Sequence, residues 1–587
     1  MKRRLWQRGV TFVMRPVALA AAARARARRA PKAARPAVAA SRPARFLFAV
    51  ASPEFLRYFD STMEALVQRG HHVSVAVNWL RERKKARLDE LIGEPRIEVA
   101  GVIPKRGDLW TPLARAVRGT MDFIRYLDPR FADAPALRAR MVRKSLPALL
   151  EPVNRIRSLS PGSVNRLQRS LQRVERAIPV ARPLLWFLDT QKPDVVIVSP
   201  LVDASSDQVD LVRASQAAGI TTVAAIASWD NLTNKGHMRV VPDLVTVWNE
   251  RQREEATTLH GIPSERVAVT GAQLFDRWFE RRPSQSREAF CAMVGLPGDR
   301  PIVLYTGSSV FIARSEFEVP FVRRWMATLR SSAHPLLRDA AVLVRPHPFN
   351  CDAWEHADFS EFAPAAVWPR QRYTPAAEAS RNSFFDSLYY SEAVVGINTS
   401  AMIEAAILGK PVLSLMTGDF AGTQEGTLHF RYMLPENGGF LRVASSLEDH
   451  AGQLVEVLRD PEVTRAQTLQ FVQHFLRPQG LEKPCTPILV DALERAAAEG
   501  PRVPVRERLA DKSLRVALAP LAMAMRANDR WKGLSVEKAA HRMKRRTRKM
   551  AYESYASVKR AARLTYGRVL KKPSRRALEA LRVIFSR

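Results

Sequence analysis

Short apolar runs alternate with helical stretches along most of this 587-residue chain, beginning at residue 45. The first run, at 45–50, is followed by a helical stretch at 62–69 and a second run at 73–77. A buried strand, a helix and another buried strand make a βαβ unit, which requires a parallel sheet. The sequence therefore predicts an α/β fold.

This alternation continues to about residue 500 in two series. The first series adds runs at 194–198, 221–226 and 242–248, and the second has runs at 302–305, 341–344, 393–397, 412–415 and 440–443. Because single cores stop growing at about 250–300 residues, we expect two Rossmann-like domains, at 45–240 and 241–500. The run at 266–272 is interpreted as the first strand of the second domain or its linker. Residues 109–189, rich in Arg and Leu at helical spacing, predict a helical insertion in the first domain.

The formal net charge of +34 is distributed very unevenly. Residues 1–45 hold 13 Lys+Arg and no acid, and residues 501–587 hold 25 Lys+Arg and 6 Asp+Glu, so 34 − 13 − 19 leaves +2 for residues 46–500. A nearly neutral body with two basic ends is not the pattern of a basic nucleic-acid-binding domain. We interpret 1–44 as a basic arm, either disordered or lying on a membrane surface, and 501–587 as a basic helical tail.

Several classes of protein are disfavoured by what the sequence lacks. No stretch offers the roughly 18–20 uninterrupted apolar residues of a membrane-spanning helix, since Arg15 and Pro16 interrupt the best candidate. That same stretch has no clean signal-peptide cleavage site. The cysteines, Cys291, Cys351 and Cys485, are too few and scattered for a disulfide framework. We expect a cytoplasmic protein.

Ligands of open parallel sheets bind beyond the carboxyl ends of the strands, and polar residues follow the run at 393–397. Asn398, Thr399 and Ser400 would open a helix there, and a helix N-terminus with hydroxyls beside it favours phosphate. Glu404 follows one turn later, where it could accept hydrogen bonds from a ribose diol. The alternative is that Thr399 or Ser400 is only an N-cap.

Two further strand ends carry candidate donor-binding residues. Arg345 and His347 follow the run at 341–344 and suit a diphosphate, because a guanidinium matches phosphate oxygens and an imidazole can donate to developing charge. The alternative is a salt-bridged arginine and a packed histidine. Thr306, Gly307 and Ser308 form a loop in which glycine lets the backbone approach a ligand, although such a loop is often an ordinary turn.

These residues carry a family resemblance. The motifs are P-D-L-V-T-V-W-N-E at 242–250, H-G-I-P-S-E-R-V-A-V-T-G at 260–271, R-P-H-P at 345–348 and G-I-N-T-S-A-M-I-E-A-A-I-L-G-K-P-V at 396–412. Together they resemble the second half of a GT-B glycosyltransferase, within the group of CDP-glycerol glycerophosphotransferases and UDP-GlcNAc 2-epimerase-like enzymes. The likeness spans roughly residues 45–500, and its specific motifs are confined to 242–415.

The resemblance implies that the second domain binds a nucleotide-activated donor and the first an acceptor, across a cleft. Carried over by position, Thr399 and Ser400, with Asn398 beside them, would contact donor phosphates and Glu404 the ribose. Arg345 and His347 would then meet the leaving group. Such enzymes need no metal or other cofactor, since helix termini and basic side chains stabilise the diphosphate. The Thr-Ser pair stands where the epimerase-like members carry Gly-Gly, which argues against epimerisation.

A transferase also needs a base for the acceptor hydroxyl, and the first domain should supply it. Asp230, in the loop after the run at 221–226, is the first candidate, and Glu54, after the first run, is the second. Lys235 and His237 could hold an anionic acceptor. The loop could instead be a structural turn capped by Asp230. Glu425 is a further donor-side candidate.

The basic tail has its own chemistry. Residues 541–549 hold six Lys or Arg and no acid, and Met543, Met550, Val558 and Ala561 would give a helix there a narrow apolar face. Such a helix can lie on an anionic membrane surface, each basic residue contributing about 1 kcal/mol. Binding to nucleic acid, or packing on the body, is the alternative, and a lipid-linked acceptor favours the membrane.

The sequence therefore predicts a metal-independent transferase. It would move a glycosyl or glycerophosphate unit from a nucleotide-activated donor to a surface-glycan or lipid-linked acceptor, at the inner face of the cell membrane. One alternative is a UDP-GlcNAc 2-epimerase-like enzyme, and another is a non-catalytic protein that binds membrane or nucleic acid.

Overall fold

The computed structural model describes residues 43–78, 96–204, 206–373, 377–502, 507–527, 537–538, 540–544 and 547. Apart from Pro43, these belong to the compact unit Ala44–Arg587. The expected basic arm at 1–44 and most of the basic tail, with Met550, Val558 and Ala561, lie outside the described residues.

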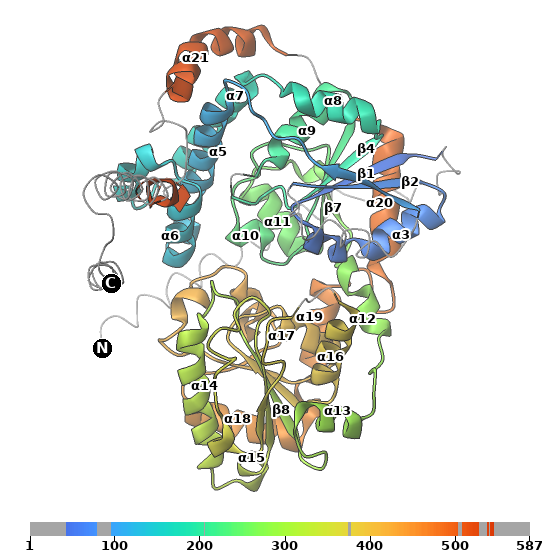
Figure 1. The fold of residues 1–587 in the computed structure, drawn as a ribbon, viewed down its shortest axis with the longest axis vertical. Helices are drawn as coiled ribbons and strands as arrows, with labels where there is room; N and C mark the ends of the chain where they lie inside the picture. The colour runs from blue at the N-terminus through green and yellow to red at the C-terminus, as the bar shows by residue number, and fades with distance from the viewer. Residues whose placement is uncertain are drawn as a thin grey trace, which may run out of the picture. The chain divides into compact units, whose positions relative to one another are not determined.

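The described strands form two sheets that are parallel throughout (Figure 1). The first sheet has the order β3-β2-β1-β4-β5-β6-β7. Its strands are β1 (Arg45–Val50), β2 (His72–Val77), β3 (Ile97–Val102), β4 (Val195–Ser199), β5 (Thr221–Ala225), β6 (Leu244–Val247) and β7 (Val267–Val269). The second sheet has the order β10-β9-β8-β11-β12-β13. Its strands are β8 (Ile302–Thr306), β9 (Ala341–Arg345), β10 (Ala365–Val367), β11 (Ala393–Gly396), β12 (Val412–Leu415) and β13 (Arg442–Ala444).

Helices cover both faces of each sheet. Around the first sheet lie α3 (Asp60–Gln68), α9 (Gln208–Ala217), α10 (Asn231–Asn234), α11 (Glu250–Thr258) and α20 (Cys485–Glu499). The second sheet is surrounded by α13 (Arg287–Val294), α14 (Ser315–Arg330), α15 (Pro335–Arg338), α16 (Glu378–Tyr389), α17 (Ala401–Ile407), α18 (Leu447–Arg459) and α19 (Arg465–Phe475). The expected α/β fold of two Rossmann-like domains is confirmed. We call the part around the first sheet the first half and the part around the second sheet the second half.

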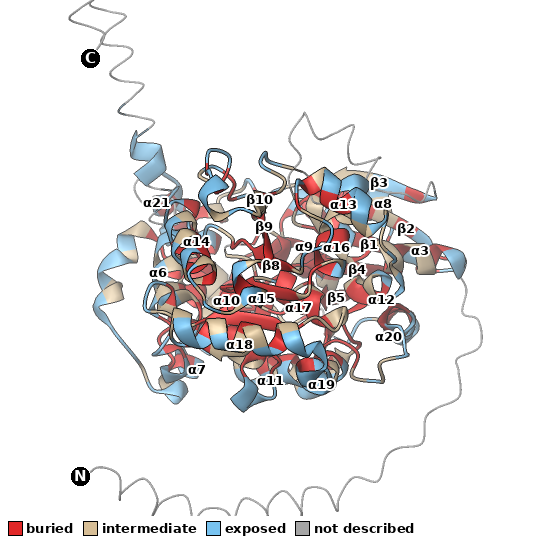
Figure 2. Cartoon of the chain, turned by 90° about the horizontal axis from the view of Figure 1, so that it is seen from below, coloured by how far each residue is buried: buried red, intermediate tan, exposed pale blue. Residues whose placement is uncertain are grey.

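The apolar runs became strands because each can bury both of its faces. In β1, Phe46 and Phe48 belong to one core cluster and Leu47 and Ala49 to another, on the opposite face of the sheet. Alternate side chains of a strand point to opposite faces, so a continuous apolar run fits only a sheet covered on both sides. Figure 2 shows central strands such as β8 as buried and the outer faces of the helices as exposed.

The boundary between the halves differs from the expected one at 240/241. β6 pairs with β5, and β7 with β6, so both extend the first sheet. α20 also returns to the first half, where Leu489, Val490 and Leu493 join the core cluster that holds Phe46. An apolar run indicates that a strand is buried but not which sheet the strand joins. The boundary between the two halves could therefore not be predicted from the sequence.

The chain crosses between the halves twice, and the two crossings lie side by side. The backbone N–H of Ala272 donates to Leu476 O at 2.9 Å. The carboxylate of Asp276, in α12 (Asp276–Glu280), accepts hydrogen bonds from the backbone N–H groups of Cys485 at 2.9 Å and Thr486 at 2.6 Å. One buried carboxylate therefore ties the outgoing segment to the returning one.

Residues 109–189 are helical, and they contain α5 (Thr111–Arg125), α6 (Pro135–Lys144), α7 (Pro161–Ala177) and most of α8 (Arg182–Gln191). A buried ion network fixes them to the first half, because Arg118 of α5 binds Glu175 of α7 at 2.7 Å and Asp210 of α9 at 2.8 Å. The tail begins with α21 (Leu509–Ala527), which packs on α5 and α7 through Ala522 and Met525 (Figure 1).

Candidate functional site

The loops at the carboxyl ends of the two sheets contact each other. Trp229, after β5, donates from Nε1 to Oγ of Ser400, which precedes α17, at 3.2 Å. Thr233 Oγ1 lies 3.4 Å from Nδ1 of His429, whose ring meets the Trp229 ring edge-on with centroids 4.7 Å apart. No sequence signal marks His429, because it follows no strand directly. These contacts bring together the strand ends where ligands of parallel sheets bind.

Glu404 of α17 is half-buried beside this contact. Its carboxyl accepts no hydrogen bond and forms no ion pair with any residue of the described ranges. Burial raises its pKa to about 8, and the charge of Arg57 opposes that rise. A half-buried carboxyl without a partner is costly unless something binds it, so Glu404 is the strongest single indication of a ligand site.

Arg57 comes from the first half, in the 3-10 helix η1 (Pro53–Tyr58) that follows β1. Its guanidinium is exposed, donates to the Tyr58 hydroxyl at 2.8 Å and stacks over that ring at 4.8 Å. Although burial by surrounding atoms opposes its charge, Tyr58 and Glu404 raise its pKa. The sequence reasoning missed Arg57, whose only signal was a place three residues after Glu54 in the loop beyond the first strand.

His347 lies within the electrostatic range of Arg57. Burial, helped by Arg57, lowers the pKa of His347 to about 4, so the ring is neutral near pH 7. Its Nδ1 accepts a hydrogen bond from the backbone N–H of Phe349 at 3.2 Å, which leaves the proton on Nε2. No residue that the structure describes bonds to Nε2. His347 can therefore donate one hydrogen bond to a ligand oxygen.

Gly307 allows the loop after β8 to pack against the loop after β9. Its N–H donates to Arg345 O at 2.8 Å. A Cβ at this position would lie 2.9 Å from the backbone nitrogen of His347 and 3.1 Å from Cα of Pro346. The glycine therefore serves a close approach between two backbones, and through it the position of His347.

Arg345 is buried and turned toward α16. Its Nη1 donates to Ser383 O at 3.0 Å and to Ser387 Oγ at 2.8 Å, and its guanidinium lies over the rings of Tyr373 and Phe384 at 5.5 and 5.3 Å. Burial lowers its pKa. The structure thus shows Arg345 as a buried positive charge behind the strand end, held by serines and aromatic rings.

Three other expected donor-binding side chains also point into the protein. Thr306 Oγ1 donates to Val395 O at 3.2 Å, and Asn398 Nδ2 donates to Thr423 O at 2.7 Å. Ser308 is fully buried and its backbone N–H donates to Glu318 Oε1 at 2.9 Å. Polar residues at a strand end must satisfy the backbone groups that the sheet no longer pairs, and the side chains of Thr306 and Asn398 do so. The Ser308 hydroxyl is buried and forms no hydrogen bond within the described part of the chain.

The remaining donor-side candidates are accessible. Thr399 is half-buried, and its Oγ1 accepts from the backbone N–H of Ala401 at 3.4 Å, as an N-cap would. Ser400 and Glu425 are exposed, and Glu425 follows the 3-10 helix η8 (Ala421–Thr423) by two residues.

Asp230, the first candidate base, is held by its own loop. Ser228 donates to Oδ1 at 2.6 Å and Asn234 donates to Oδ2 at 3.2 Å. Although burial opposes ionisation, Lys235 and His429 lower the pKa of Asp230 to about 2. A carboxylate of such low pKa is a poor proton acceptor at neutral pH, and it suits a fixed negative charge that shapes the loop.

The acceptor-side candidates differ in accessibility. Lys235 is half-buried, with Nζ 3.2 Å from Asp203 Oδ1. His237 is buried, its ring stacks on His260 at 5.6 Å, and burial lowers its pKa to about 3. The structure thus places the His237 ring in the interior, with neither ring nitrogen hydrogen-bonded to a described residue, and a contact of His237 with an acceptor stays a prediction. Glu54, the second candidate base, is half-buried in η1.

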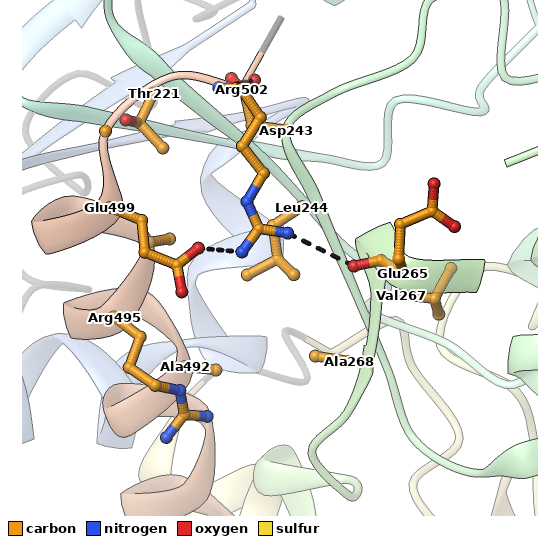
Figure 3. Close-up of a pocket in the computed structure, with 12 residues that line it drawn as sticks. Thr221, Asp243, Leu244, Glu265, Val267, Ala268, Ala492, Arg495, Glu499 and Arg502 are labelled. Carbon is orange, nitrogen blue, oxygen red and sulfur yellow. Dashed lines mark hydrogen bonds and ion pairs between the residues drawn. The ribbon is translucent and has the colours of Figure 1, made fainter. Parts of the chain in front are cut away.

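A separate pocket lies at the opposite edge of the first sheet (Figure 3). One side of the pocket is lined by the first residues of three strands, Thr221 of β5, Leu244 of β6 and Val267 of β7. The C-terminal end of α20 lines the other side. Arg502 reaches across it, binding Glu499 and the carbonyl of Glu265 (Figure 3). Ligands of parallel sheets bind at the carboxyl ends of the strands, whereas this pocket lies at their amino ends.

Two further searches cover the described part of the chain only. Within it, no three His, Cys, Asp or Glu side chains are grouped so that they could hold a metal ion. No helix in these ranges combines the length and apolarity that a membrane crossing requires.

No family model and no curated protein matches this chain. Solved structures similar to it include UDP-GlcNAc 2-epimerase from Neisseria meningitidis bound to UDP-GlcNAc, with 12% identity, a TM-score of 0.44 and coverage of 77% of this chain and 100% of that chain. A glycosyltransferase from Rickettsia africae has 10% identity, a TM-score of 0.44 and coverage of 78% and 99%. A variant of the wall teichoic acid polymerase TagF has 9% identity, a TM-score of 0.40 and coverage of 78% and 90%. Such low values say nothing about the reaction, donor or acceptor of this chain.

Proposed function

We propose that this chain transfers a glycosyl or glycerophosphate unit from a nucleotide-activated donor to a surface-glycan or lipid-linked acceptor. The observation that carries the proposal is the unpartnered carboxyl of Glu404, which lies within the electrostatic range of the exposed cation of Arg57. The neutral donor of His347 lies within the range of the same cation. A nucleotide diphosphate offers what these groups lack, namely hydroxyl donors for a carboxyl and anionic oxygens for a cation.

In the proposed site, Glu404 accepts hydrogen bonds from the ribose diol. Arg57 and Nε2–H of His347 contact the phosphate oxygens, and the buried charge of Arg345 adds to the positive field behind them. As the bond to the leaving nucleotide breaks, negative charge grows on those oxygens, and donors already in place stabilise it without reorganisation and without a metal. Ser400 and Thr399 line the same approach.

The acceptor hydroxyl must lose a proton as its oxygen attacks. Because Asp230 is a weak base, we assign this proton to Glu54, which lies in the same 3-10 helix as Arg57. Asp230 then fixes the loop that carries Lys235, and Lys235 meets an anionic acceptor. The new bond forms to the acceptor oxygen, the old bond to the nucleotide breaks, and the proton moves to the Glu54 carboxylate.

An acceptor that is a lipid-linked glycan places the reaction at the cytoplasmic face of the cell membrane. The basic segments 1–44 and 501–587 support this location through their charge, since anionic headgroups attract Lys and Arg by about 1 kcal/mol each.

The first test measures thermal stabilisation of the full chain by CDP-, UDP-, GDP- and dTDP-linked compounds. A ligand at 100 times its Kd adds about 2.7 kcal/mol, which a melting curve resolves. We expect one nucleotide family to raise the melting temperature, and Glu404→Gln or Arg57→Ala to remove the rise. Two exposed residues, Glu448 and Arg495, supply the matched controls Glu448→Gln and Arg495→Ala.

The proposed site would be wrong if the control variants also lost the nucleotide-induced rise in melting temperature. It would also be wrong if both Glu404→Gln and Arg57→Ala kept that rise. A nucleotide sugar converted without any added acceptor would instead support the epimerase-like reaction.

A further inference from the structure

The helical insertion is basic although the body of the chain is nearly neutral. Residues 138–182 hold 11 Lys+Arg and 2 Asp+Glu, a balance of +9. Residues 46–500 as a whole carry +2, so the rest of them carries −7. The positive charge of the folded body is therefore concentrated in one structural feature, separate from the basic ends.

On α7 this charge forms one stripe. Arg166, Arg169, Arg173 and Arg176 follow one another at spacings of three and four, which places them on one helix face, and all four are exposed. Arg166 and Arg169 bond only to Ser163 Oγ and to the backbone of α7, each at 3.4 Å, and no carboxylate within the described ranges pairs with Arg173. Three of these guanidinium groups are thus available to an anionic partner.

A row of exposed apolar side chains lies on the neighbouring helix α21. Leu509, Val516 and Met523 stand seven residues apart, so they share one face over about 21 Å, and they are 81%, 74% and 53% exposed. The opposite face of α21 is the one that packs on α5 and α7 through Ala522 and Met525. Nothing in the described part of the chain covers this apolar row.

The stripe and the row lie on two helices that contact each other where α7 ends. Arg515 of α21 donates from Nε to the carbonyl of Ala177 at the end of α7 at 2.8 Å, and Arg176 lies 3.9 Å from Asp511. We call this the α7–α21 surface, made of Arg166, Arg169, Arg173, Leu509, Val516 and Met523. The next helix, α8, exposes Trp186 by 71%, and tryptophan favours the interface between water and lipid.

We infer that the α7–α21 surface docks on an anionic lipid bilayer. A bilayer accepts both features at once, because headgroup phosphates pair with guanidinium groups while leucine, valine and methionine enter the acyl boundary. A nucleic acid would use the arginines but gain nothing from the apolar row, and a second copy of the same basic surface would be repelled. This deepens the membrane partner of the proposed function, and it holds whether or not the transfer reaction is the one proposed.

The experiment compares sedimentation of the full chain with phosphatidylcholine vesicles that contain or lack phosphatidylglycerol. One variant carries Arg166→Gln, Arg169→Gln and Arg173→Gln, and another carries Leu509→Gln, Val516→Gln and Met523→Gln. The matched control carries Arg282→Gln, Arg459→Gln and Arg495→Gln, three exposed arginines outside the α7–α21 surface. Melting curves and the nucleotide shift are recorded for every variant.

We expect the control to bind anionic vesicles as the parent does. The arginine variant should bind less tightly by roughly fivefold for each arginine, since about 1 kcal/mol is a factor of about five. The apolar variant should also lose binding, on vesicles that contain phosphatidylglycerol. If it melts earlier than the parent, Val516→Gln alone replaces it.

Binding of both variants at the control's level would overturn the inference. So would loss of RNA binding in the arginine variant while its vesicle binding stayed intact, because the surface would then be a nucleic-acid site. The rise in melting temperature on adding nucleotide compounds should be the same in every variant. Vesicle binding can then fail without contradicting the proposed nucleotide site.

Discussion

Gly307 has no side chain to offer a ligand, yet the candidate site depends on it. A Cβ there would strike backbone atoms of Pro346 and His347, and backbone cannot rotate away as a flexible side chain can. We expect Gly307→Ala to reduce the free energy of unfolding by about 1–3 kcal/mol, measured by urea denaturation, and to weaken nucleotide binding by displacing His347.

Gly298→Ala is the matched control, because a Cβ at Gly298 meets nothing within 4 Å. Equal stability of the two variants would show that the two loops are not held as closely as described.

Part of the candidate site could be predicted residue by residue. Glu404 and His347 follow strands of the second sheet and are accessible, which is what the position after a buried run indicates. Arg345 and Asn398 follow strands in the same way, but their side chains donate hydrogen bonds to carbonyl groups of the protein itself. They do so because the backbone groups beyond a strand end also need hydrogen-bond partners. Arg57 could not be found, since its proximity to Glu404 depends on how the halves meet.

At the scale of secondary-structure elements, Asp276 joins α12 to the start of α20. It accepts from two backbone N–H groups of α20 and from Nη2 of Arg477 at 3.0 Å, and both side chains are buried. We expect Asp276→Ala to lower the free energy of unfolding by about 3–5 kcal/mol, because Arg477 is left as a buried charge without its carboxylate.

Chemical denaturation and limited proteolysis near residue 480 would measure this effect. The exposed Asp299, changed to Ala, is the control. A loss no larger than that of the control would mean that the crossing segments are held by other contacts.

The strands themselves were predictable, and their assignment to sheets was not. β6 and β7 are short, largely apolar runs, as is β8, which begins the other sheet. What decides between the sheets is the path of the connecting segments and the packing of α20, a helix more than 200 residues further along the chain. Such long-range pairing leaves no local trace in sequence.

For the whole molecule, buried ionisable groups set the dependence of stability on pH. Burial lowers the pKa of five histidines, namely His237, His260, His347, His429 and His450, and raises to about 8 the pKa of three glutamates, Glu255, Glu318 and Glu404. The histidines are protonated more readily when unfolded, so stability rises with pH up to their ordinary pKa of 6.5. The glutamates are deprotonated more readily when unfolded, so stability falls from their ordinary pKa of 4.5 up to about 8.

Below pH 6.5 the five histidines outweigh the three glutamates, and above it only the glutamates act. We therefore expect the melting temperature to rise from pH 4.5 to about 6.5 and to fall from there to pH 8, as calorimetry would record. Glu404→Gln should make the fall shallower, whereas the exposed Glu448→Gln should not. A melting temperature that keeps rising to pH 8 would contradict the neutral state of these glutamates.

The adjacent crossings at Ala272 and Leu476 make the second half an insertion between two neighbouring points of the first. The chain enters and leaves the second half at these two neighbouring points. A recombination with breakpoints at Ala272 and Leu476 would therefore exchange the whole second half as one segment. The first sheet, α20 and the α7–α21 surface would remain with one parent. Under the proposed function, such an exchange would change the donor specificity and leave the acceptor and the membrane contact unchanged, and a chimaera joined at these two points would test that modularity directly.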